Sequence, residues 1–227
     1  MATGIDSKAP QRESVTRERI LRAAVDLADR DGIQAVSMRK IAHELGVVPM
    51  ALYKHVSNKD EILDGVVEVL VGEIDPPATR SDWKTAFRER ILSARRVLLR
   101  HPWASRVIES RTQPGPALLA YMDSMLGLFR SGGFSMDLTH HAMHALGSRV
   151  LGFSQELFDD NADVDPEVEA EMYRAMGAAF PNILELASTV LHDDSTVVGG
   201  RGCDDQFEFE FALDLMLDGL ERLRDRA

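Results

Sequence analysis

The sequence contains a single cysteine, Cys203, so no disulfide can form within the chain. A lone thiol is typical of proteins in a reducing compartment. There is no run of about 18 or more apolar residues, which excludes a transmembrane helix. The N-terminal residues also lack the apolar core of a signal peptide. We therefore expect a cytoplasmic protein.

Motifs for catalysis and for cofactor binding are also missing. The glycines at 199–202 lack the Lys-Ser/Thr pair of a phosphate-binding loop, and residues 159–165 lack the central glycine and final glutamate of a calcium loop. No constellation of acid, base and nucleophile stands out. We predict a protein that is not an enzyme and binds no cofactor. Whether His140 and His144, four residues apart, share a metal ion stays open, because no third ligand is identifiable.

Positive charge is scarce overall but unevenly distributed. The 227 residues carry a formal net charge of −11. Residues 1–60 have ten Lys and Arg against eight Asp and Glu, and the remainder has 16 against 29. A mildly basic N-terminal part on an acidic remainder suits a protein that touches nucleic acid at one end only.

Residues 37–59 form the stretch around which the chain is organised. Ser37 is placed to cap a helix whose apolar positions recur at helical spacing. Gly46 follows the last of these positions, where a chain leaving a helix often requires positive φ. Pro49 suits the first turn of a second short helix because its missing N–H costs nothing there. The spacing predicts two short helices joined by a tight turn, the pattern of a helix-turn-helix.

The second of these helices has distinct inner and outer faces. Leu52 and Val56 are expected to face inward with Val47. The outer face then mixes apolar, aromatic and cationic side chains, a combination suited to thymine methyls, base edges and phosphates in a major groove. An ordinary helical hairpin remains the alternative from periodicity alone.

Two further helices complete this part of the chain. One is predicted from a cap at Thr16 to Gly32. The other begins at a capping pair, Asn58 and Glu61, and ends where Asp75-Pro76-Pro77 removes backbone donors. Residues 1–14 are polar and are expected to form a disordered tail. We place the domain boundary after residue 75, with a DNA-binding domain at 15–75 and an effector-binding and dimerisation domain at 76–227.

Residues 17–65 resemble the DNA-binding domain of the TetR family of bacterial transcriptional regulators. The matching runs, in order, are Ile20-Leu-Arg-Ala-Ala-Val-Asp-Leu-Ala, Gly32-Ile, Ser37-Met-Arg-Lys-Ile-Ala, Leu45-Gly-Val, Leu52-Tyr-Lys-His-Val and Asn58-Lys-Asp-Glu-Ile-Leu. The resemblance implies DNA contacts from Ser37, Met38, Arg39, Pro49, Met50, Ala51, Tyr53, Lys54, His55 and Lys59. Position 49 departs from the family pattern. Many members have a polar side chain there that can read a base edge, and Pro49 cannot do so through hydrogen bonds.

The remainder reads as a succession of helices, so the fold class predicted is all-α: an N-terminal three-helix helix-turn-helix domain and a C-terminal helical bundle. Residues 206–211 alternate like a β-strand, but the helical pattern after them favours a helix from about Asp205 to Arg224. Further helices are predicted at about 172–179 and 181–191, and residues 136–158 form another. No repeat of fixed period occurs, which excludes a solenoid.

The middle helices are rich in methionine and aromatic residues, which line adaptable pockets but fill ordinary cores more often. The resemblance implies a cavity for a small effector. Candidate lining residues are Trp83, Phe87, Trp103, Met122, Met125, Phe129, His140 and His144. Family members that sense a metal-chelated drug use histidine ligands, but this chain has no histidine between 55 and 101, so we do not infer that ligand.

The last helix is apolar on two faces, which implies burial on both sides. One side suits the subunit's own core and the other a second subunit, with a large monomeric core as the alternative. The resemblance implies a four-helix contact across a two-fold axis. Candidate interface residues are Ala142, Ala145, Arg149, Phe153, Phe209, Leu213, Met216 and Leu220.

These observations predict a homodimeric DNA-binding regulator, a repressor that a small-molecule effector releases from a palindromic operator. An activator or an effector-independent regulator is one alternative. A helical ligand carrier or enzyme whose helix-turn-helix merely packs is another. The sequence identifies neither the effector nor the operator.

Overall fold

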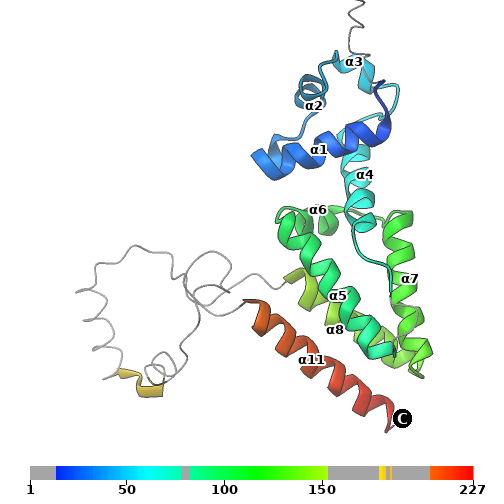
Figure 1. Cartoon of the computed structure of the whole chain (residues 1–227), viewed down its shortest axis with the longest axis vertical. Helices are drawn as coiled ribbons and strands as arrows, with labels where there is room; N and C mark the ends of the chain where they lie inside the picture. The colour runs from blue at the N-terminus through cyan, green and yellow to red at the C-terminus, as the bar shows by residue number, and fades with distance from the viewer. Residues whose placement is uncertain (1–13, 78–81, 153–178, 183–184, 186–204, 227) are drawn as a thin grey trace, which may run out of the picture. The chain divides into compact units, whose positions relative to one another are not determined.

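The computed structural model describes residues 14–77, 82–152, 179–182, 185 and 205–226. It is all-helical over these residues, which confirms the predicted fold class (Figure 1). None of the helices described is long and apolar enough to cross a membrane. The helices are α1 (Arg17–Asp31), η1 (Ile33–Ala35), α2 (Met38–Glu44), α3 (Pro49–Leu52), α4 (Lys59–Gly72), α5 (Trp83–Arg100), α6 (Ala104–Ser110), α7 (Pro116–Ser131), α8 (Met136–Gly152) and α11 (Asp205–Arg224).

The chain divides into two compact units, Met1–Phe134 and Ser135–Ala227. The alternating segment 206–211 lies inside α11, so the prediction of a helix there is confirmed. The helices predicted at about 172–179 and 181–191, and the last residues of the one predicted at 136–158, lie largely outside the described residues.

Three side chains cap the helices of the N-terminal bundle, which we define as α1–α4. Thr16, Ser37 and Asn58 each accept a hydrogen bond from an amide of the first turn, as predicted. The capped amides are those of Arg19, Lys40 and Glu61, at 3.2, 3.3 and 2.8 Å. These caps determine where α1, α2 and α4 begin.

Gly46 makes the turn between α2 and α3. Its φ is +64°, a conformation that residues with a Cβ rarely adopt. Gly46 N–H donates to the carbonyl of His43, and Val47 N–H donates to the carbonyl of Ala42. This pair of bonds is a Schellman motif, which ends α2 sharply and allows Pro49 to start α3 three residues later.

We expect Asn58→Ala to lower the free energy of unfolding by about 1 kcal/mol, because one amide of α4 loses its side-chain acceptor. Urea denaturation followed by circular dichroism at one fixed protein concentration measures this. Gln34→Ala, which truncates an exposed side chain of the same bundle, is the control and should leave the unfolding midpoint unchanged. Equal midpoints for the two variants would contradict the capping role.

Helices α5 and α7 pack through an aromatic cluster. Phe129 is fully buried, and its ring centre lies 4.5 Å from that of Phe87, 5.0 Å from Phe134 and 5.9 Å from Trp83. A Schellman motif at Gly132 and Gly133 ends α7 and turns Phe134 back onto the cluster. The cluster fixes α5 against α7.

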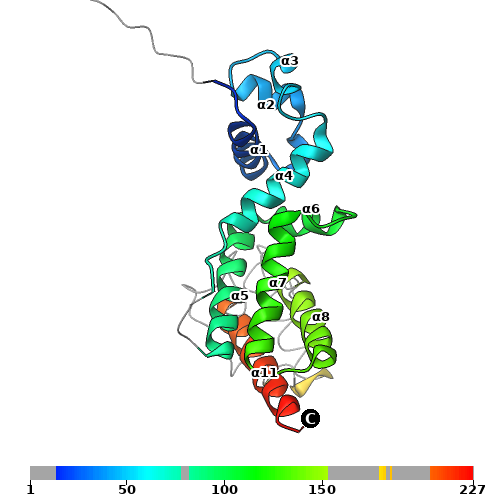
Figure 2. The same ribbon diagram turned by 90° about the vertical axis from the view of Figure 1, so that its right-hand side faces the viewer.

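Helix α4 runs from α1–α3 to α6 and α7 and packs against both, and the two views show this course (Figures 1 and 2). Its bundle-facing residues Ile62, Val66 and Leu70 are buried in one continuous core with α1–α3. That core also includes Trp103 and Val107, from the start of α6 and from within it. The bundle and α6 therefore share apolar packing.

In the second unit, α8 packs against α11. Ala142 and Leu146 of α8 are buried, as are Phe209, Leu213 and Leu217 of α11. The guanidinium of Arg149 joins the two helices, because its Nη2 donates to the carbonyl of Glu208 at 2.9 Å and it lies over the Phe209 ring.

Candidate nucleic-acid interface and effector body

The outer surface of α2 and α3 is apolar, aromatic and cationic, as predicted for a DNA-binding surface. Leu52 and Val56 are buried beneath it, whereas Met50 is 70% exposed and Tyr53 is 49% exposed. Large apolar side chains that are exposed together on one surface mark an interaction site. Helix α3 is a single turn, so Met50 lies on a very short helix and Tyr53 at its end.

Cations on this surface differ from those around it in having no acidic partner. Arg17, Arg22 and Arg30 on α1 lie within ion-pair distance of Glu61, Glu18 and Glu44 respectively. By contrast, Arg39, Lys54 and Lys59 are exposed, and none forms an ion pair with any described residue. Unpaired cations on one face are free to neutralise phosphates.

Most of the remaining predicted contact residues are more covered. Ser37 uses its hydroxyl as the cap of α2, and Met38, Ala51 and His55 are half-buried. Pro49 is exposed at the start of α3. Val48, which the sequence reasoning missed, is 68% exposed beside it. Its position in the turn, one residue after Val47, was the only available signal.

One joint between the bundle and α5–α6 is a shared carboxylate. The indole Nε1 of Trp103 donates to Asp29 Oδ1 at 2.7 Å, and His101 Nδ1 lies 2.8 Å from the same oxygen. Beside it, Arg100 Nη2 donates to Glu73 Oε2 at 2.7 Å. Asp29 lies in the last turn of α1 and Glu73 directly follows α4, so both helices are tied to the corner between α5 and α6.

Acidic residues along α4 form a second joint. Arg111, just beyond α6, lies 3.4 Å from Asp60 and 3.2 Å from Asp64. The Glu68 carboxylate accepts from the Ala117 amide at the start of α7, where the helix dipole favours negative charge. The sequence reasoning missed these residues, because their partners lie about 50 positions away along the chain.

The structure distributes the predicted pocket residues among several environments. Trp83, Phe87 and Phe129 form the aromatic cluster, and Met125 is buried with them on α7. Trp103 belongs to the core of the N-terminal bundle. Three exposed residues complete the set: Met122 on α7, and His140 and His144 on α8. In the described part of the chain, no group of three metal-ligating side chains is suitably placed for an ion.

The predicted interface residues are mostly covered within one subunit. Ala142, Phe209, Leu213 and Leu220 are buried, Arg149 and Met216 are half-buried, and Ala145 is exposed. Phe153 lies outside the described residues. A different row of α11 is apolar and exposed. Its members, which we call the exposed row, are Phe207, Phe211 and Leu215.

The helix-turn-helix, its unpaired cations and the helices joined to it define a DNA-binding regulator. Residues 20–66 match the family of bacterial regulatory proteins of the tetR type, and residues 76–224 match the tetracyclin repressor-like C-terminal domain. The chain therefore belongs to the TetR family of transcriptional regulators, whose members bind operator DNA and small-molecule effectors. It is not an enzyme, because this is a non-enzymatic family.

Three similar proteins illustrate the relationship. The transcriptional repressor DrrR1 of Streptomyces coeruleorubidus is 30% identical over 96% of this chain and 81% of its own. A helix-turn-helix regulator of Saccharopolyspora erythraea is 35% identical, but the match spans only 61% of this chain and 59% of that one. ActR of Streptomyces coelicolor, solved with actinorhodin, is 27% identical, with a TM-score of 0.69 over 92% of this chain and 97% of its own.

Proposed function

We propose that this protein represses transcription in the cytoplasm by binding a palindromic operator as a homodimer, and that a small-molecule effector releases it. Residues 15–75 form the DNA-reading part, and residues 76–227 form the effector-binding and dimerising part. The observation that carries the proposal is the outer surface of α2 and α3, where large apolar side chains are exposed beside unpaired cations.

The residues on this surface divide between the two kinds of DNA contact. Arg39 at the start of α2 is placed for a guanine edge or a phosphate, and Met50 for a thymine methyl. Tyr53, Lys54 and Lys59 are placed for the DNA backbone, with Lys54 also reaching toward base edges. Because Pro49 offers no donor, base reading depends on Arg39, Met50 and Lys54.

A gel shift of the full-length protein on its own upstream DNA, over a salt series, tests the proposal. Specific retardation that weakens steeply with salt is expected, because bound phosphates release counterions. A helix-turn-helix that merely packs would show no retardation. Adding candidate small molecules to the same assay then separates an effector-released repressor from an effector-independent one.

Dimerisation would use the exposed row of α11, together with the exposed face of α8. A row of this kind is a common sign of an interface, and a four-helix contact would cover it. Two-fold symmetry would then place two α3 helices about 34–36 Å apart, one turn of DNA. The reading surface of a single subunit would be too small for tight binding.

We expect Phe211→Glu to give a monomer, because the dimer would bury its carboxylate without a partner. Sedimentation velocity measures the change, and operator affinity should fall with it. Phe180→Glu, which alters an exposed phenylalanine outside α11, is the control and should remain dimeric. A Phe211→Glu protein that still sediments as a dimer would exclude the exposed row as the interface.

Release requires an effector that prefers a conformation unsuited to DNA, since a ligand with equal affinity for both conformations shifts nothing. The contacts at Asp29 and Arg111 would transmit such a conformational change to the N-terminal bundle. A displacement of α6 would move α1 through Trp103 and His101, and α4 through Arg111. The spacing of the two α3 helices would change as a result.

A further inference from the structure

Arg90, in the middle of α5, is a buried cation without an anionic partner. Only 9% of its surface is exposed. Its Nη1 donates to the carbonyl of Asp75 at 2.9 Å, and its guanidinium carbon lies 4.8 Å from the centre of the Tyr121 ring. No carboxylate among the described residues forms an ion pair with it. Buried charges are normally paired, so the arrangement is unusual.

Tyr121 does not supply the missing negative charge. Burial raises the pKa of its phenol to about 12, so the hydroxyl stays protonated near neutral pH. The same loss of solvation lowers the pKa of Arg90, but a guanidinium remains charged in proteins. The pair therefore keeps one uncompensated positive charge.

One edge of this guanidinium is unused. Nε is buried and has no hydrogen-bond partner, and Nη2 makes no hydrogen bond to any described residue. These two nitrogens form a planar fork whose spacing matches the two oxygens of a carboxylate. Arg90 therefore has hydrogen-bonding capacity that no described residue uses.

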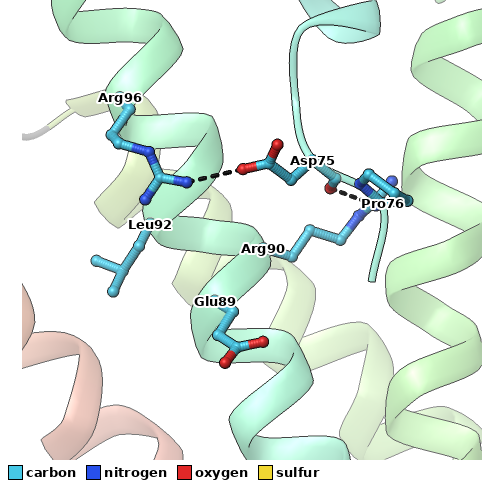
Figure 3. A pocket seen from close by; sticks show the side chains of 6 residues that line it. All are labelled: Asp75, Pro76, Glu89, Arg90, Leu92 and Arg96. Carbon is cyan, nitrogen blue, oxygen red and sulfur yellow. Dashed lines mark hydrogen bonds and ion pairs between the residues drawn. The ribbon is translucent and has the colours of Figure 1, made fainter. Parts of the chain in front are cut away.

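A cavity of about 270 Å³ lies beside Arg90, between α5 and the segment that follows α4. Pro76 and Leu92 supply apolar walls (Figure 3). Three other charged side chains line the cavity. Asp75 and Arg96 are already paired, because Asp75 accepts from Ser93 at 2.8 Å and from Arg96 at 2.8 Å, and Glu89 is exposed to solvent. Arg90 is thus the unpaired cation of the cavity.

We propose that this cavity binds a small organic carboxylate, which pairs with the Arg90 guanidinium while its carbon skeleton lies against Pro76. Asp75 shares the same guanidinium and closely follows α4, so an occupied site acts on the end of the helix that carries the N-terminal bundle. This regulatory consequence, unlike the binding itself, rests on the proposed function.

Calorimetric titration of the full-length protein with benzoate tests the site, with neutral benzamide and inorganic phosphate as comparison probes. We expect saturable binding of benzoate and none of benzamide.

Arg90→Lys, which keeps the charge but loses the planar guanidinium, should weaken benzoate binding about tenfold or more. Glu89→Gln, which removes an exposed carboxylate lining the cavity, should tighten it about two- to fivefold. Arg106→Lys, which makes the same exchange at an exposed position of α6, is the matched control and should bind as wild type.

NMR of the arginine Nε–H groups keeps the test valid if Arg90→Lys folds poorly, because it uses the wild-type protein. Benzoate should shift the Arg90 resonance and leave that of Arg106 in place. No saturable binding, phosphate binding as tight as benzoate, or equal binding by a folded Arg90→Lys protein would overturn the site.

The regulatory consequence is tested separately by operator gel shift. Benzoate should weaken operator binding by the wild type, and Arg90→Lys should need about tenfold more benzoate, or more, for the same effect. Benzoate binding without any change in operator affinity would overturn the regulatory role alone. A protein that bound no operator even without benzoate would instead refute the proposed function and leave the calorimetric result standing.

Discussion

The double variant Tyr53→Ala, Lys59→Ala is expected to bind operator DNA about 1,000-fold more weakly than wild type. Each contact is assigned about 1 kcal/mol, and a dimer loses both contacts twice, so the total is about 4 kcal/mol. Both side chains are exposed, so the fold should be unaffected. Quantitative gel shift at fixed salt measures the affinity, and circular dichroism confirms the fold.

The salt dependence of operator binding is a second test of this prediction. Lys59 is assigned to a phosphate, so its loss from two subunits should reduce the slope of log affinity against log salt by about two. Arg106→Ala removes the same charge from α6, outside the assigned surface, and should keep both affinity and slope near wild type. Unchanged operator affinity in the double variant would reject α2 and α3 as the reading surface.

The Phe129→Ala variant is expected to lose about 3–5 kcal/mol of unfolding free energy. Phe129 is fully buried and lies between Trp83, Phe87 and Phe134. Truncation removes its apolar contacts and leaves a cavity that three large rings fill poorly, because they are held by their own helices. Urea denaturation at one fixed protein concentration measures the loss, since dimer stability depends on concentration.

Two other substitutions on α7 serve as comparisons for Phe129→Ala. Phe129→Leu retains most of the buried volume and should lose much less stability. Leu119→Ala changes an exposed residue of α7 and should be close to neutral. A Phe129→Ala protein as stable as Leu119→Ala would show that the aromatic cluster does not hold α5 against α7.

The local features of the N-terminal bundle were predictable because short-range chemistry controls them. Thr16, Ser37 and Asn58 cap helices through amides three residues away, and Gly46 ends α2 because the turn requires positive φ. The reading of 206–211 as helix also succeeded, since the following residues continue a helical pattern. Each of these signals lies within a few residues of the feature that it determines.

Contacts distant in sequence were not predictable in the same way. An aspartate at position 29 looks like any exposed helix-end carboxylate until the fold brings Trp103 against it. Arg90 reads as an ordinary charged residue of an amphipathic helix, and only its burial between Asp75 and Tyr121 shows that it lacks a counter-charge. For α11, the sequence showed two apolar rows, and the prediction assigned the row with Phe209 and Leu213 to the dimer interface. The subunit itself buries these two side chains.

The sequence by itself determined that this is an all-helical regulator with a helix-turn-helix at its N-terminal end, because caps, turns and apolar periodicity are encoded locally. Only the tertiary structure decided which α11 row is exposed, which carboxylates join the bundle to α6 and which cation stays unpaired. Burial and pairing depend on neighbours that are remote along the chain, and no local pattern specifies them.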